Sequence, residues 1–112
     1  MLKVYGFLTK REGMETEAFI EHYETKHVPL VLSLAPTPIV YKRNYVVRGD
    51  EFNREEDTID FDVITELVFA DRAGFIEWVE KLSVETISTD EERFLDRSRT
   101  RAYVIEEHVT SG

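Results

Sequence analysis

His27 is the residue whose type and position best suit it to catalysis. It follows Phe19 and Tyr23 in steps of four, so the three side chains share one face of a predicted helix and point toward the interior. An imidazole titrates close to neutral pH and can take up or release a proton during a reaction. The alternative is a core histidine with a structural hydrogen bond, and the pattern alone leaves both interpretations open.

Two tyrosines are placed to bring hydroxyl groups into the same space. Tyr23 precedes His27 by one helical turn, and Tyr41 lies on the helix-facing side of the next predicted strand. A phenol can hydrogen-bond a substrate oxygen, although a buried tyrosine commonly has a purely structural partner. We predict a catalytic role for His27 and Tyr41 and a substrate-binding role for Tyr23.

Four further residues are candidates for substrate contact. Asn44 and Glu66 lie on the opposite strand face if strand alternation holds, so they either contact substrate or line a subunit interface or the centre of a barrel. Trp78 and Phe94 are expected to belong to the core and also to the wall of a substrate pocket.

Other kinds of chemistry lack the residues that they need. The chain has no cysteine, which excludes thiol nucleophiles, disulfides and Cys-based metal sites. Its five glycines form no phosphate-binding loop. His22 and His27 are five residues apart, which places them on different sides of a helix and outside a zinc-binding HExxH motif. We therefore predict no metal and no cofactor.

Length and charge narrow the class of protein. The 112 residues, of which 42% are hydrophobic, fit a single domain spanning residues 1–112 with its own core. A net charge of -9 argues against a nucleic-acid partner. No apolar run approaches the ~18 residues of a membrane helix and the N-terminus lacks a signal-peptide core, so we expect a cytoplasmic protein with no membrane partner.

The elements that must position these side chains follow from hydrophobic periodicity and turn signals. A first helix starts near Glu15 and carries Leu30 and Leu34 on the His27 stripe, with a kink predicted just after His27 because Pro29 removes a backbone donor. The predicted strands are 2–9, 39–47, 61–69 and 100–107, and 48–58 is a charged loop.

Two further helices are expected between the last two strands. Asp71 is the predicted N-cap of one, whose buried residues are Phe75, Trp78, Val79 and Leu82. Thr89 and Glu92 have the spacing of a capping box at the start of a short second one, which carries Phe94 and Leu95.

This order predicts an α+β fold of the ferredoxin-like βαββαβ type. A four-stranded antiparallel sheet then carries its helices on one face only. The other face needs a cover, and a second copy of the chain is the expected one, so we predict a homodimer.

Several spaced motifs resemble the EthD family of the dimeric α+β barrel superfamily. The main one is Phe19-x-x-x-Tyr23-x-x-x-His27-x-Pro29-Leu30, and the segments Tyr41-x-x-Asn44, 61–71 and 90–96 also fit, in the same order. The resemblance implies a homodimer in which two sheets form a barrel and each subunit keeps its own pocket between sheet and helices. It also points to His27 as the acid–base group, with Tyr41 and Tyr23 as helpers. Some relatives have a second histidine after the strand asparagine, where this chain has Tyr45 and Val46.

Relatives of this kind include cofactor-free dehydratases, decarboxylases, isomerases, polyketide cyclases and monooxygenases. The leading hypothesis is therefore a cofactor-independent lyase, of dehydratase or decarboxylase type, that acts on a small aromatic or polyketide-derived molecule. A muconolactone-type isomerase or a cofactor-free monooxygenase is the first alternative. A non-catalytic protein that binds a small ligand is the second.

Overall fold

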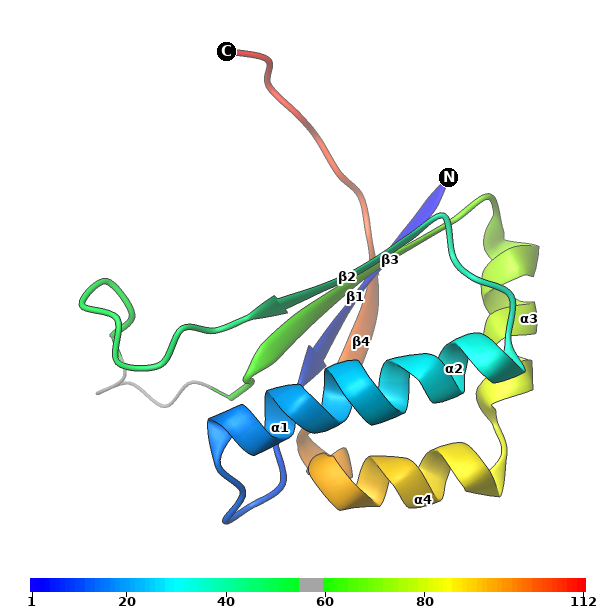
Figure 1. The fold of residues 1–112 in the computed structure, drawn as a ribbon. Coiled ribbons are helices and arrows are strands. Elements are labelled where there is room, and N and C mark those ends of the chain that lie inside the picture. The colour runs from blue at the N-terminus through cyan, green and yellow to red at the C-terminus, as the bar shows by residue number, and fades with distance from the viewer. Residues whose placement is uncertain (55–59) are drawn as a thin grey trace.

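The computed structural model describes residues 1–54 and 60–112 (Figure 1). Along the chain the elements are β1 (Leu2–Leu8), α1 (Thr16–His22), a π-helical turn (Tyr23–His27), α2 (Val28–Leu34), β2 (Val40–Tyr45), β3 (Val63–Phe69), α3 (Arg72–Leu82), α4 (Glu85–Phe94), a 3-10 turn (Arg97–Arg99) and β4 (Arg101–Ile105). The predicted strand ends agree to within two residues. The predicted loop 48–58 lies partly outside the described residues.

The strands form one sheet in the order β2-β3-β1-β4, and every neighbouring pair is antiparallel. The helices lie on one side of this sheet, and the other side is open (Figure 1). The α+β, ferredoxin-like fold is therefore confirmed. β1 and β2 are joined through the first helical segment and are not neighbours in the sheet, because β3 lies between them. This is the arrangement of a split βαβ unit.

The core lies between the sheet and the first helical segment. Alternate residues of β3 face the helices, as the period of two in a strand requires. Val63 of β3, Phe19 of α1 and Phe94 of α4 have no exposed surface. Together with Tyr23 they form the centre of the larger of two hydrophobic clusters.

The first helical segment runs from Thr16 to Leu34 through a π-helical turn. The N–H group of Val28 donates to the carbonyl of Tyr23, five residues back. The wider turn directly precedes Pro29, which has no N–H to continue an α-helical ladder. The irregularity predicted beside Pro29 therefore takes the form of a π-helical turn that ends at His27, and the chain stays helical through it (Figure 1).

The π-helical turn also determines which side chains are buried. In an α-helix, a residue lies about 40° further around the axis than the residue four positions before it. A π-helical turn contains more residues, so side chains four positions apart stay closer to one face. Phe19, Tyr23, His27 and Val31 consequently all stay buried on one face. The prediction that Leu34 shares this stripe is wrong, because Val31 takes the inward position and Leu34 is exposed.

The two later helices match the sequence prediction in part. The carboxylate of Asp71 accepts a hydrogen bond from the Gly74 N–H at 2.9 Å, so the predicted N-cap of α3 is confirmed. The prediction that Val79 is buried is wrong: it is 43% exposed, because α3 touches the sheet mainly through the rings of Phe75 and Trp78 against Phe69.

The predicted capping box is also wrong. α4 begins at Glu85 after the extended residue Val84, so Thr89 lies inside the helix. The polar spacing that suggested a helix start is part of the exposed face of a longer helix. No described helix has the length and apolar character needed to span a membrane.

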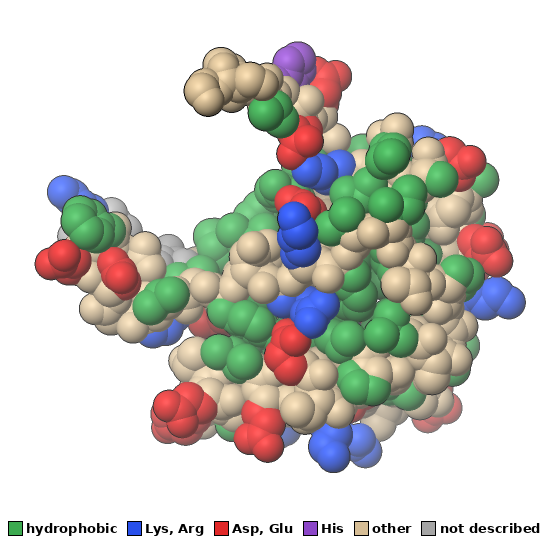
Figure 2. All heavy atoms as spheres, turned by 45° about the horizontal axis from the view of Figure 1, so that its top comes forward, with side chains coloured by type: hydrophobic (Ala, Val, Ile, Leu, Met, Phe, Trp, Pro, Cys, Tyr) green, Lys and Arg blue, Asp and Glu red, His purple; other side chains and the backbone are tan. Residues whose placement is uncertain are grey.

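The open face of the sheet mixes apolar and charged side chains. Figure 2 shows hydrophobic groups on either side of a row of acidic and basic groups on this side of the molecule. At its centre Glu66 accepts a hydrogen bond from the hydroxyl of Tyr5 at 3.1 Å and lies 3.7 Å from the ammonium groups of both Lys3 and Lys42. The face therefore carries a polar network among its apolar side chains.

Asp71→Ala is expected to lower the free energy of unfolding by about 1 kcal/mol, because the Gly74 N–H loses its cap. Asp71→Asn should retain nearly all of the stability, since asparagine is an equally good N-cap. Urea unfolding followed by circular dichroism measures both variants. Equal destabilisation by the two substitutions would contradict a capping role.

Candidate active site between the sheet and the helices

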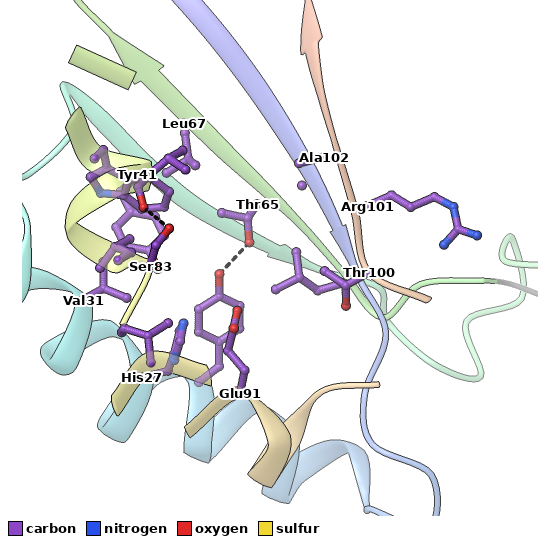
Figure 3. Close-up of a pocket in the computed structure, with 17 residues that line it drawn as sticks. His27, Val31, Tyr41, Thr65, Leu67, Ser83, Glu91, Thr100, Arg101 and Ala102 are labelled. Carbon is purple, nitrogen blue, oxygen red and sulfur yellow. Dashed lines mark hydrogen bonds between the residues drawn. The ribbon is translucent and has the colours of Figure 1, made fainter. Parts of the chain in front are cut away.

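A cavity of about 290 Å³ lies between the helix-facing side of the sheet and the helices α2, α3 and α4 (Figure 3). This volume is close to the lower end of the range of small-molecule sites. It exists because the sheet presents small side chains here: Gly6 pairs with Thr65 on one side and with Ala102 on the other. The row of small residues crosses three strands and leaves room that larger side chains would fill.

His27 lines this cavity and is itself only 6% exposed. Its Nδ1 lies 2.9 Å from Oδ2 of Asp90. A carboxylate only accepts hydrogen bonds, so Nδ1 carries the proton and the lone pair of the neutral ring lies on Nε2. The arrangement resembles the Asp–His part of a catalytic triad, in which the carboxylate fixes the orientation and tautomer of the base.

Asp90 holds a second histidine in the same way. Nε2 of His22 lies 2.9 Å from Oδ1 of Asp90, so each carboxylate oxygen has an imidazole partner. Burial alone would raise the pKa of Asp90, but the hydrogen bonds from His27 and His22 outweigh it and hold the pKa below its ordinary value. Asp90 therefore stays ionised and joins α4 to the first helical segment at two points.

Phe94 packs against the two imidazoles and does not line the cavity. Its ring centroid lies 4.8 Å from that of His22, in a stacked arrangement, and 4.9 Å from that of His27. It is fully buried and is absent from the cavity lining. The structure thus places Phe94 behind the histidines, as a packing residue that limits how their rings can move.

Tyr23 and Tyr41 both line the cavity, as predicted. The hydroxyl of Tyr23 lies 2.7 Å from Oγ1 of Thr65, which Figure 3 shows as a dashed line. Burial raises the pKa of both phenols above the ordinary value, and the neighbouring Tyr23 raises that of Tyr41 further. Both side chains are therefore neutral hydrogen-bond donors at physiological pH.

The strand residues around Tyr41 hold it in place. The guanidinium carbon of Arg43 lies 4.9 Å from the centre of the Tyr41 ring. Arg43 also donates two hydrogen bonds to the carboxylate of Glu24, at 2.6 and 2.9 Å, and Glu24 accepts a further one from Tyr45. This bidentate pair joins β2 to the π-helical turn and so sets the distance between Tyr41 and His27.

The remaining predicted site residues divide between the two faces of the sheet. Trp78 lines the cavity, and its buried indole N–H has no hydrogen-bond partner among the described residues. Asn44 and Glu66 lie on the open face, where Asn44 donates to the carbonyl of Ile64 at 3.0 Å. The structure does not bring Asn44 or Glu66 together with His27.

Two residues of the site were missed in the sequence: Glu91, which lines the cavity, and Asp90, which holds His27 from behind. Asp90 and Glu91 belong to α4, where Ile87, Asp90 and Phe94 form the buried stripe. The spacing of these three residues was the available signal, because it puts a carboxylate on an apolar helix face. Because the helix was predicted to start at Thr89, Ile87 was left outside it and the buried stripe was not recognised. No group of three or more side chains suited to hold a metal ion occurs in the part of the chain that the structure describes.

Asp90→Asn is expected to lower the free energy of unfolding by about 1–3 kcal/mol near neutral pH, because one carboxylate oxygen is replaced by an amide donor that faces an imidazole. The folded-state pKa of Asp90 is depressed. Its contribution to stability is therefore present above the ordinary carboxyl pKa and is lost as the pH falls through the folded-state pKa.

Urea unfolding at about pH 7 and about pH 2 checks this prediction. The difference between wild type and Asp90→Asn should shrink in acid. Glu92→Gln is the matched control, since Glu92 is a neighbouring carboxylate with a 68% exposed side chain. A difference of equal size at both pH values would show that Asp90 does not act as a charge.

Comparisons with known proteins agree with this architecture. An EthD family protein from Bacillus halodurans has a TM-score of 0.65 at 19% identity, with coverage of 96% of this chain and 99% of that one. A protein from Arabidopsis thaliana has a TM-score of 0.66 at 13% identity, with coverage of 99% of both chains. HapK from Hahella chejuensis has a TM-score of 0.61 at 12% identity, with coverage of 100% of this chain and 96% of that one.

At these identities the solved structures establish the fold alone. A comparison with curated proteins gave no match. The model of the EthD domain family matches residues 11–98, which include the first helical segment with His27 and the whole of α4 with Asp90. The resemblance seen in the sequence is confirmed, and the chain belongs to the EthD domain family.

Proposed function

We propose that the protein is a cofactor-independent lyase that acts on a small aromatic or polyketide-derived carbonyl compound. His27 is its acid–base group. The observation that carries this proposal is the pairing of His27 with Asp90 at the wall of a largely apolar cavity. Asp90 holds the proton on Nδ1, so Nε2 of this buried imidazole is the basic nitrogen. Such a ring is suited to proton transfer.

In the proposed reaction Nε2 of His27 removes a proton from the carbon next to the substrate carbonyl. Negative charge then develops on the carbonyl oxygen as an enolate forms. The hydroxyl of Tyr41, kept protonated by its burial, donates a hydrogen bond to this oxygen. A preorganised donor in a site that excludes water stabilises such charge more strongly than water does.

Asp90 acts as a positioning residue in this scheme. It stabilises the imidazolium that forms when His27 takes the proton, and it keeps the ring from turning. His22 shares the carboxylate and so prevents Asp90 itself from turning toward the cavity. Phe94 packs against both rings and limits the same motion.

A test of the proposal needs no knowledge of the natural substrate. Benzylacetone, an uncharged aromatic ketone, exchanges its α-hydrogens for deuterium when a base removes them. The wild type is expected to accelerate this exchange in D₂O, and His27→Ala is expected to reduce the accelerated rate about 10²–10⁴-fold. Proton NMR measures the loss of the α-hydrogen signals.

His108→Ala serves as the matched control, because His108 is an exposed histidine on the tail after β4. It should leave the exchange rate unchanged, and circular dichroism checks that each variant is folded. Full exchange activity in folded His27→Ala would overturn the assignment of the base. Binding of benzylacetone without exchange by the wild type would favour a ligand-binding protein instead.

We also propose that a second copy of the chain covers the open face of the sheet. Tyr103 is more than half exposed on this face, and its ring contacts that of Phe7 at a centroid distance of 6.1 Å. Exposed apolar surface of this kind marks interaction sites. Light scattering is expected to give about twice the 13.1 kDa mass of the chain. Tyr103→Glu should shift the mass to that of a monomer, and a monomeric wild type would overturn the proposal.

A further inference from the structure

Glu91 is a second ionisable group on the wall of the same cavity. It lies four residues after Ile87 on α4, and both side chains line the cavity. The adjacent Asp90 turns toward the histidines, whereas Glu91 points from α4 toward the sheet, beside His27 (Figure 3). A carboxyl group on an apolar helix face loses hydration and lowers the stability of the fold unless a polar partner compensates. Its presence here therefore calls for an explanation.

The surroundings of Glu91 raise the pKa of its carboxyl above the ordinary value. Burial raises the pKa of this carboxyl, and the charge of Asp90 acts in the same direction, while His27 and Arg97 act against it. The contact with Arg97 is long, 3.7 Å, and the Arg97 side chain is half exposed. A solvated cation at that distance neutralises a carboxylate only weakly.

The charge of the cavity also limits which substrates it can hold. Apart from the imidazole of His27, the only basic side chain among the described lining residues is Arg101. Figure 3 shows the Arg101 side chain extending away from His27, Tyr41 and Glu91. With no cationic side chain of the described lining directed into this largely apolar cavity, a substrate carboxylate would be left without an ionic partner.

We propose that Glu91 is the second proton-transfer group of the site and that the substrate is an uncharged β-hydroxy ketone from which water is eliminated. This inference rests on the proposed function of His27. It selects dehydration from the two lyase types, because decarboxylation requires a carboxylate substrate. Glu91 is placed to act as the acid and His27 as the base.

The atoms balance in this step. His27 takes the α-proton, and the electrons of the C–H bond form the enolate. The electrons of the enolate then form the double bond between the α- and β-carbons as the β-carbon–oxygen bond breaks. The departing hydroxyl takes the proton of the Glu91 carboxyl and leaves as water. Transfer of a proton from the imidazolium to the Glu91 carboxylate then restores both groups, and no oxidant or reductant is needed.

The substrate class is tested by binding. Trp78 is the only tryptophan of the chain and lines the cavity, so its fluorescence reports on ligands there. Benzylacetone and hydrocinnamate carry the same ring, but one ends in a ketone and the other in a carboxylate. The ketone is expected to bind about tenfold or more tightly at neutral pH, and Glu91→Gln should leave this ratio nearly unchanged, because a protonated carboxyl carries no charge for the substitution to remove.

Equal or tighter binding of hydrocinnamate by the wild type would overturn the substrate class and leave the assignment of His27 intact. A marked fall of this ratio in Glu91→Gln would show that Glu91 is charged in the free protein and would overturn its role as the acid. Binding of neither compound would overturn both proposals, because no aromatic carbonyl compound would then enter the cavity.

The acid role is tested by separating two reactions. Elimination from β-hydroxybenzylacetone gives benzylideneacetone, which absorbs in the near ultraviolet, whereas α-hydrogen exchange of benzylacetone needs only the base. Glu91→Gln is expected to lose about 10²-fold or more in elimination and to keep exchange within a few-fold of wild type. Glu92→Gln, on the exposed face of α4, should change neither rate.

Equal loss of both reactions in Glu91→Gln would make Glu91 a structural residue, and loss of neither would remove it from the mechanism. A wild type that exchanges but does not eliminate would overturn the dehydratase inference alone. A wild type that does not catalyse exchange would instead contradict the proposed function of His27.

Discussion

The hydrogen bonds that Asp90 accepts from two histidines determine much of the arrangement around the cavity. A carboxylate that is 5% exposed would be strongly destabilising if it were unpaired. Here each of its oxygens lies 2.9 Å from an imidazole nitrogen. Because His22 and His27 lie at the two ends of the same irregular turn, this one side chain fixes α4 against α1 and against the π-helical turn together.

The same turn is held from the other side by the sheet. Glu24 lies within it and receives a bidentate hydrogen bond from Arg43 of β2. The π-helical turn is therefore anchored to α4 through its histidines and to the sheet through its glutamate. These two sets of contacts stabilise the π-helical turn, whose hydrogen bonding is less favourable than that of an α-helix.

The cavity is the space between the anchored helices and the sheet that no side chain fills. Gly6, Thr65 and Ala102 form a row of small residues across neighbouring strands, and α3 packs on the sheet through few aromatic contacts without a fully buried residue. A side chain on Gly6 would meet Leu8 at 3.1 Å. The space above the sheet thus depends on small residues in the strands and on a rigid helical layer that cannot collapse into it.

The sequence alone determined the fold class, the family and the inward orientation of His27. Strand alternation and helical periodicity are local consequences of backbone geometry, so they can be recognised without coordinates. The same alternation correctly assigned Asn44 and Glu66 to the face opposite Tyr41. These features rest on short-range order in the chain and on a run of motifs that recurs in a family.

The tertiary structure decided the rest of the site. Asp90 is separated from His27 by 63 residues, and only the packing of α4 against the first helical segment brings the two together. The π-helical turn that keeps His27 on the buried face depends on anchors in α4 and β2, and the cavity depends on the register of three strands. None of these contacts is local, because each joins segments whose approach is set by the folded chain as a whole.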